Sequence, residues 1–240
     1  MKEQLTISDA VTLLSSKENH IIESSLIKLQ SFSASNYANK DIIRDLGGIV
    51  ALIALLSTGT DKVKEHALKT LIILSGNHHN QNHIREQGGI ASLVTLLIFG
   101  TSVHRGLAAE ALGFLAIANQ ENKNAIRQFG GVICLVKLLF NESNIEKKEA
   151  AKALAILAID NDQNKNDIRE AQGIEPLMTL LSEGTEKGQA AAALALCNLA
   201  NGNQLNQDAI KAIEKSEALL KLRFSNKEKT ANMWRLVAHS

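Results

Sequence analysis

A dipeptide of isoleucine followed by a basic residue recurs through the chain at a nearly constant interval. The five copies are Ile43-Arg44, Ile84-Arg85, Ile126-Arg127, Ile168-Arg169 and Ile210-Lys211. Successive copies lie 41, 42, 42 and 42 residues apart. A period of this length over most of the chain indicates a solenoid, in which each unit buries its apolar face only by stacking on its neighbours.

Each unit has the pattern of three helices. A glycine-containing pair follows each of the first four dipeptides: Gly47-Gly48, Gly88-Gly89, Gly130-Gly131 and Gln172-Gly173. In the second unit we predict a short helix over residues 82–87 that ends at the glycines, because glycine adopts the left-handed conformation without strain. Apolar periodicity predicts a second helix over 91–98 and an alanine-rich third helix over 103–118. The chain has one proline and only 3% aromatic residues, which also favours an all-α fold.

Asparagine occupies two fixed positions in every unit. Seven residues before each anchor isoleucine stand Asn36, Asn77, Asn119, Asn161 and Asn203, and four residues before it stand Asn39, Asn80, Asn122, Asn164 and Asn206. We interpret both sets as helix caps rather than as a binding site, because caps prefer this residue type for backbone reasons. The later asparagine is expected to cap the start of the short helix, and the earlier one the end of the preceding long helix.

Composition excludes several classes of function. A net charge of +1 gives no electrostatic basis for binding nucleic acid or an anionic membrane. The two cysteines, Cys134 and Cys197, are too few for a disulfide framework or a zinc site, and we expect both to be buried and inert. The sequence predicts no signal peptide and no membrane span. A soluble protein of the cytoplasm, or of nucleus and cytoplasm, is the resulting expectation.

The repeated pattern N-x-x-N-x-x-x-I-R-x-x-G-G-I-x-x-L-V-x-L-L, followed by A-A-x-A-L-x-x-L-A, resembles the armadillo repeat. The units beginning at Asn77 and Asn119 match most closely, and Pro176 stands where armadillo repeats often carry proline. HEAT repeats, the alternative, usually have two helices and lack the Gly-Gly-Ile hinge. The resemblance implies a right-handed α-α superhelix of three-helix repeats that forms a single domain over residues 1–240. Its predicted units are an N-terminal cap (1–35), full repeats (36–76, 77–118, 119–160, 161–202) and a C-terminal cap (203–240).

The resemblance also implies a binding groove lined by the third helices, in which partners commonly lie as extended peptides. We placed the groove by aligning the Ala-Leu pairs that begin at Ala67, Ala111, Ala153 and Ala193. The predicted groove residues are His66, Lys69, Ile73, Glu110, Gly113, Ile117, Lys152, Ala155, Ile159, Ala195 and Leu199. The nuclear-import receptors of this family carry Trp and Asn at two of these positions, and this chain carries neither there, so we do not expect a receptor for basic import signals. A groove of this composition suits an apolar or amphipathic segment. The alternative is that Ile117 and Ile159 pack inside their own repeats.

No residue pattern points to catalysis. The chain lacks a P-loop and a dinucleotide-binding glycine motif. His79 and His83 are four residues apart, but they are expected to straddle a helix start and have no supporting carboxylate or thiolate, so we read a solvated loop rather than a metal site. Glu146 and Glu149 are expected on a solvated helix edge among lysines. We assign no cofactor, no metal and no enzymatic activity, and we interpret Trp234 as an anchor of the C-terminal cap.

The sequence therefore predicts a non-catalytic protein-interaction module, a scaffold or adaptor whose groove holds a segment of another protein. One alternative is an accessory or self-associating subunit that uses an edge or the convex face. A bacterial effector that binds a host protein in the host cytosol is another. Nucleic acid and integral membrane are not expected partners, and homo-oligomers are possible but not indicated.

Overall fold

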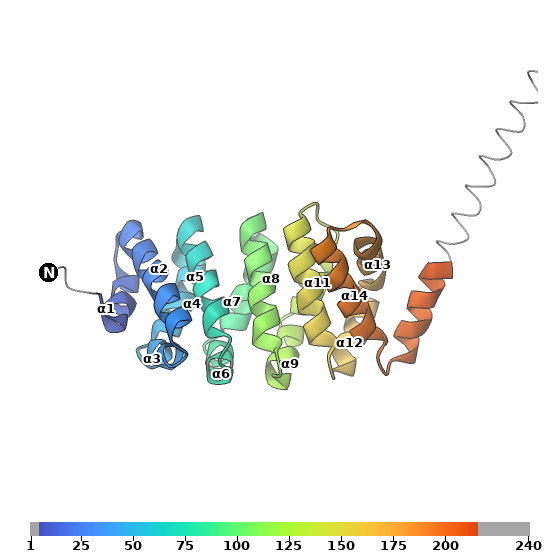
Figure 1. Cartoon of the computed structure of the whole chain (residues 1–240), viewed down its shortest axis with the longest axis horizontal. Coiled ribbons are helices and arrows are strands. Elements are labelled where there is room, and N and C mark those ends of the chain that lie inside the picture. Colours follow the sequence, from blue (N-terminus) through green and yellow to red (C-terminus); the bar gives the residue numbers. More distant parts are fainter. Residues whose placement is uncertain (1–4, 216–240) are drawn as a thin grey trace, which may run out of the picture.

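Groups of three successive helices, of which the third is the longest, recur along the chain in the computed structural model, which describes residues 5–215 (Figure 1). Residues 5–215 contain no strand. The first helices are α1 (Ile7–Thr12), a 3-10 turn (Leu13–Ser15) and α2 (Asn19–Ser35). Four triplets follow: α3 (Asn39–Asp45), α4 (Gly48–Thr58) and α5 (Asp61–Leu74); α6 (His78–Glu86), α7 (Gly89–Phe99) and α8 (Ser102–Ala116); α9 (Gln120–Gln128), α10 (Gly131–Leu138) and α11 (Asn144–Ala158); α12 (Asp162–Glu170), α13 (Ile174–Glu183) and α14 (Glu186–Ala200). A further helix covers 204–215.

The triplets stack into an elongated solenoid with one continuous core. The long helices α2, α5, α8, α11 and α14 stand side by side, and the short helices line one edge (Figure 1). None of the helices in residues 5–215 combines the length and hydropathy needed to cross a membrane. Trp234 and most of the predicted C-terminal cap lie outside the described residues.

Small residues allow the long helices to approach closely. Ala108, Ala109 and Ala111 on α8 are fully buried, as are Ala150, Ala151 and Ala153 on α11. A Cβ atom on Gly113 would lie 3.4 Å from the Cα atom of Ala153 on the neighbouring helix. Leucines such as Leu112 and Leu154 are also fully buried and fill the space that the alanines leave.

The two glycines of each pair have different roles. The first has a positive φ, +79° at Gly47 and +77° at Gly88, which turns the chain between the short helix and the second helix. The second has a negative φ but no room for a side chain: a Cβ atom on Gly89 would lie 2.5 Å from Ile84 Cγ2 and 2.8 Å from its carbonyl oxygen. In the fourth triplet Gln172 occupies the first position with φ +63°, at a cost of about 1 kcal/mol. At the second position, Gly173, a Cβ atom would lie 2.9 Å from Ile168 Cγ2 and 3.0 Å from its carbonyl oxygen, so a side chain there is sterically unfavourable.

The asparagines are helix caps, but from the second unit onwards the two sets have the opposite roles to those predicted. In the first unit the earlier asparagine, Asn36, is the C-cap of α2, as predicted. The earlier asparagine accepts backbone N–H groups at the start of the short helix: Asn119 Oδ1 accepts from Asn122 N at 3.0 Å, and Asn161 Oδ1 from Asn164 N at 2.9 Å. The later asparagine donates backwards to the end of the preceding long helix, as Asn122 Nδ2 does to Leu115 O at 2.8 Å. The prediction was wrong because α6, α9 and α12 start about four residues earlier than expected, at His78 rather than at residue 82 in the second unit. This moves the N-cap from the later asparagine to the earlier one.

The later asparagine also ties neighbouring units together. Asn122 Nδ2 donates to Gln81 O at 3.3 Å, and Asn206 Nδ2 donates to Lys165 O at the same distance. Both asparagines are fully buried. In these units one side chain therefore satisfies two backbone carbonyls, one at a helix end and one in the neighbouring short helix.

In the units that begin at Asn119 and Asn161, the residue after the later asparagine is a lysine that closes the other end of its own unit. Lys123 Nζ donates to Ile159 O at 2.6 Å, and Lys165 Nζ donates to Asn201 O at 2.7 Å, so each ammonium group caps the C-terminus of a long helix. Both lysines are almost completely buried. Burial lowers the pKa of Lys123 from its ordinary value, although Asp160 partly opposes this. The negative end of the helix dipole offsets some of the cost of burying these charges.

Candidate functional site: a hollow between the long helices

Four of the predicted groove residues line one hollow between α8, α11 and α14. They are Glu110, Gly113, Ile117 and Lys152. The hollow has a volume of about 220 Å³ and is completed by Ala109, Phe114, Glu149, Ala153, Ile156 and Leu194. We call it the long-helix hollow.

The lining of the long-helix hollow is mostly apolar and reaches solvent. Phe114 is 37% exposed, Ile117 44% and Leu194 52%. Ile117 and Ile159 are therefore not enclosed within their own repeats, which was the alternative to a surface role. The hollow exists because Ala109, Gly113 and Ala153 present little or no side chain where a larger residue would fill the space.

Two of the three charged residues that line the long-helix hollow form an ion pair with each other, and the third does not. The carboxylate of Glu149, which is nearly buried, lies 2.7 Å from Lys148 Nζ and 3.2 Å from Lys152 Nζ. Glu110, half-buried on α8, forms no ion pair within residues 5–215. Burial raises the pKa of Glu110, and the nearby negative charge of Glu149 raises it further, against the opposing effect of Lys152 and Lys148.

Three predicted groove residues do not belong to an accessible surface. Ala155, Ala195 and Leu199 are fully buried, because they point towards neighbouring helices. Moreover, the Ala-Leu pairs that we aligned are not equivalent between units. The pair at Ala111 precedes the C-cap Ile117, whereas the pair at Ala193 starts two residues further from its C-cap, Asn201.

The N-caps of the long helices give the correct alignment. Thr60, Thr101, Ser143 and Thr185 each accept a backbone N–H from the first turn of their helix. Counted from these caps, Glu110, Lys152 and Leu194 occupy one equivalent position, and Phe114 and Ile156 another. Phe114, Ile156 and Leu194 were not among the predicted groove residues, although a Ser or Thr before each long helix was the signal that could have found them.

The predicted groove residues of the first full repeat lie on α5, away from the long-helix hollow. Lys69 Nζ forms an ion pair with Glu65 Oε1 at 2.6 Å. His66 is half-buried, and its backbone carbonyl accepts a hydrogen bond from Gln30 at 3.0 Å. Ile73 is also half-buried. None of the three residues lines the hollow.

Several other sequence expectations are corrected. Glu146 is fully buried rather than solvated: its carboxylate pairs with Arg105 at 2.9 Å and accepts a hydrogen bond from Asn141. These hydrogen bonds lower the pKa of Glu146 even though burial acts in the opposite direction. Glu149 is also nearly buried. A fully buried carboxylate of this kind needs such partners.

The cysteines differ from each other. Cys197 is exposed on α14, contrary to expectation, whereas Cys134 is half-buried and burial raises its pKa. His79 and His83 both lie within α6 rather than across its start. In the described part of the chain no group of three or more His, Cys, Asp or Glu side chains is placed to hold a metal ion.

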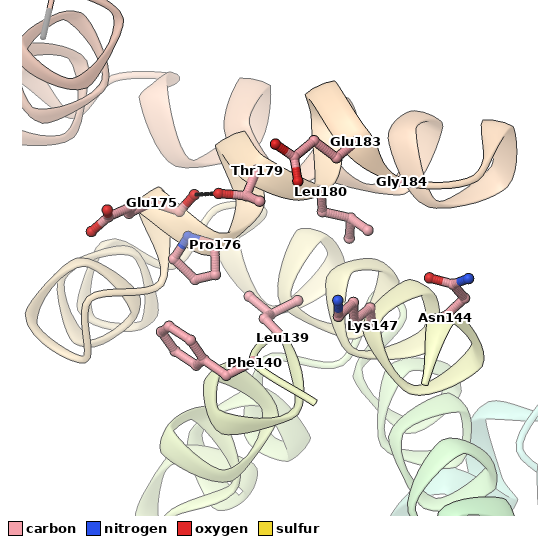
Figure 2. A pocket seen from close by; sticks show the side chains of 10 residues that line it. All are labelled: Leu139, Phe140, Asn144, Lys147, Glu175, Pro176, Thr179, Leu180, Glu183 and Gly184. Atoms are coloured by element: carbon pink, nitrogen blue, oxygen red, sulfur yellow. Dashed lines mark hydrogen bonds between the residues drawn. The ribbon is translucent and has the colours of Figure 1, made fainter. Parts of the chain in front are cut away.

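A second hollow of about 410 Å³ lies on another surface, between the end of α10, the start of α11 and α13 (Figure 2). We call it the edge hollow. It is lined by Leu139, Phe140, Asn144, Lys147, Glu175, Pro176, Thr179, Leu180, Glu183 and Gly184. A similar hollow of about 350 Å³, lined in part by Ile98 and Cys134, lies one repeat earlier between α7 and α10. Because it recurs with the repeat, we attribute the edge hollow to the regular spacing of the second helices.

Family comparisons agree with this architecture. A model described as armadillo-like matches residues 6–88, and one for the armadillo/beta-catenin-like repeat matches residues 161–201. The chain belongs to the armadillo repeat family. No curated protein matches the sequence.

Solved structures of designed proteins are similar over nearly the whole chain. An engineered protein from a structural genomics consortium is 32% identical, with a TM-score of 0.83 over 90% of this chain and 88% of the other. A designed armadillo repeat protein in complex with the peptide (KR)4 is 26% identical, with a TM-score of 0.82 over 90% and 91% of the two chains. Another designed armadillo repeat protein is 25% identical, with a TM-score of 0.83 over 91% and 92%.

Proposed function

We propose that this protein is a non-catalytic interaction module that binds a segment of another protein on the surface formed by its long helices. The long-helix hollow carries the proposal, since it combines an exposed apolar floor with charged residues at its rim. Such a composition is typical of peptide-binding grooves. A designed armadillo protein of similar structure was solved with a bound peptide, which supports this kind of use for the fold.

The proposal places the binding surface on the second to fourth full repeats. Phe114 and Ile117 at the end of α8 and Leu194 on α14 expose apolar side chains on the two sides of α11. On α5 the corresponding surface carries the paired charges Glu65 and Lys69, which favour solvent. A partner segment that crosses the long helices would therefore gain most of its apolar contact at α8, α11 and α14.

Affinity capture from cell lysate tests the proposal. The native protein is compared with the double variant Glu110→Lys, Lys152→Glu, after circular dichroism has shown that both are folded. Both positions lie at the rim of the long-helix hollow, and reversing them keeps the total charge. We expect a partner that the native protein retains and the double variant loses. A partner retained equally by both would place binding on an edge or on the convex face.

A further inference from the structure

The long-helix hollow is large enough for one bulky apolar side chain. Its volume of about 220 Å³ exceeds the roughly 150 Å³ of an engineered apolar protein cavity that binds benzene. Ala109, Gly113 and Ala153 leave the space, while Phe114, Ile117 and Leu194 provide apolar walls. A single aromatic or leucine side chain of a partner would therefore find contacts on three sides.

Glu110 is the one charged residue lining this hollow that has no ion-pair partner in residues 5–215. The other two, Glu149 and Lys152, pair with each other. An apolar side chain that covers the hollow removes water from the carboxylate of Glu110. Removing water from an unpaired carboxylate is costly unless the ligand supplies a positive charge in its place.

The free protein already shows part of this cost. Burial and the charge of Glu149 raise the pKa of Glu110, so its ionised form is less stable than that of an exposed glutamate. Lys148 and Lys152 act in the opposite direction, but both are held at the carboxylate of Glu149. An acidic ligand beside Glu110 would increase the repulsion, and a basic one would relieve it.

We infer that the partner segment inserts one bulky apolar side chain into the long-helix hollow and places a lysine or arginine beside Glu110. This inference rests on the proposed function and specifies the chemistry of its partner. A single glutamate at the rim of an apolar hollow, rather than a row of acidic residues, selects for the positive charge of the partner segment. A segment with an apolar anchor flanked by acidic residues is excluded.

A random peptide library displayed on phage tests this inference. It is selected in parallel against the native protein, Glu110→Arg, Phe114→Ala and a matched control, Glu175→Arg, which alters an exposed carboxylate of the edge hollow. We expect the native protein and the control to enrich a bulky apolar residue with lysine or arginine at a fixed spacing. Glu110→Arg should instead enrich aspartate or glutamate at that spacing.

Binding of synthetic versions of the enriched peptides measures how much each substitution weakens the affinity. We expect Glu110→Gln, which keeps the shape of the side chain, to weaken binding about tenfold, and Phe114→Ala to weaken it at least as much. The inference is rejected, with the proposed function intact, if peptides need Phe114 but show no basic preference, or the same preference with Glu110→Arg. If no peptide is enriched, or every enriched peptide binds Phe114→Ala as tightly as the native protein, the inference and the proposed use of this surface are both rejected.

Discussion

The asparagine caps and the long-helix hollow are two regions of one repeated structure with opposite patterns. At the caps every unit carries asparagine at the same two positions, and the hydrogen bond from the later asparagine to the end of the preceding long helix recurs from Asn39 to Asn206. On the long helices equivalent positions carry a glutamate, a lysine and a leucine at Glu110, Lys152 and Leu194. Positions that stay the same in every unit stabilise stacking, and positions that differ are free to recognise a partner.

Loss of a buried asparagine should have the largest effect on stability. Asn122→Ala removes two hydrogen bonds, to Leu115 O and Gln81 O, and leaves both carbonyls without this donor in the core. We expect a loss of about 3 kcal/mol in the free energy of unfolding, measured by urea denaturation. A loss below about 1 kcal/mol would show that the caps do not hold the units together.

Replacing the two glycines of a pair by alanine should lower the free energy of unfolding by different amounts, because the two glycines have different roles. Gly89→Ala forces a Cβ atom against Ile84, so we expect a loss of about 2–3 kcal/mol. Gly88→Ala meets nothing within 4 Å and bears only the cost of a positive φ, about 1 kcal/mol. Thermal unfolding of both variants measures the difference. Equal losses, or the reverse order, would contradict the assignment.

The buried carboxylate of Glu146 should make the free energy of unfolding depend on pH in the acid range. Because its pKa is lowered in the folded protein, its ionised form stabilises the fold above the ordinary pKa of a glutamate, and this contribution disappears as pH falls through the lowered value. We expect Glu146→Gln to lose about 1–2 kcal/mol at pH 7 and to approach the native stability in acid. Urea denaturation at a series of pH values measures the difference in the free energy of unfolding between this variant and the native protein. A gap that stays constant down to strong acid would contradict the ion pair with Arg105.

Changes in the long-helix hollow should barely affect stability. Phe114→Ala alters a partly exposed side chain, so we expect a change within about 1 kcal/mol. Glu110→Gln removes a carboxylate whose raised pKa marks its charged form as unfavourable, and we expect a gain of a few tenths of a kcal/mol at pH 7. Denaturation at pH 7 measures the change for both variants, and denaturation in acid, where a glutamate is neutral, should show no gain for Glu110→Gln. A large loss for either variant would assign the hollow to the core instead.

Periodicity predicted the fold, because stacking of identical units repeats the same constraints at the same spacing. The three helices, the left-handed turn at Gly88 and the capping role of the asparagines all follow from residues that recur. Helix starts were less predictable: polar residues from His78 to Gln81 read as a loop, yet the cap at Asn77 makes them helical. Local sequence does not show that Asn80 will be fully buried against the neighbouring unit.

The candidate site was predictable only in part. Glu110, Gly113, Ile117 and Lys152 lie together in one hollow because the second and third full repeats align without ambiguity. The first and fourth repeats were misaligned. In the fourth, the Ala-Leu pair recurs at more than one position of an alanine-rich helix, as at Ala193 and Ala195. Which side of such a helix faces solvent is set by its neighbours, and small residues carry no pattern that reveals it.

Photo-crosslinking from the long-helix hollow tests the central claim most directly. Benzoylphenylalanine replaces Phe114 in one variant and, as a matched control, Phe129 in another; Phe129 is 54% exposed at the end of α9 and does not line the hollow. Both variants are irradiated in cell lysate, and crosslinked peptides are identified by mass spectrometry. The account predicts crosslinks from position 114 to one contiguous segment of a partner, with none to that segment from position 129. Crosslinks to the partner from position 129 alone, or equally from both positions, would contradict it.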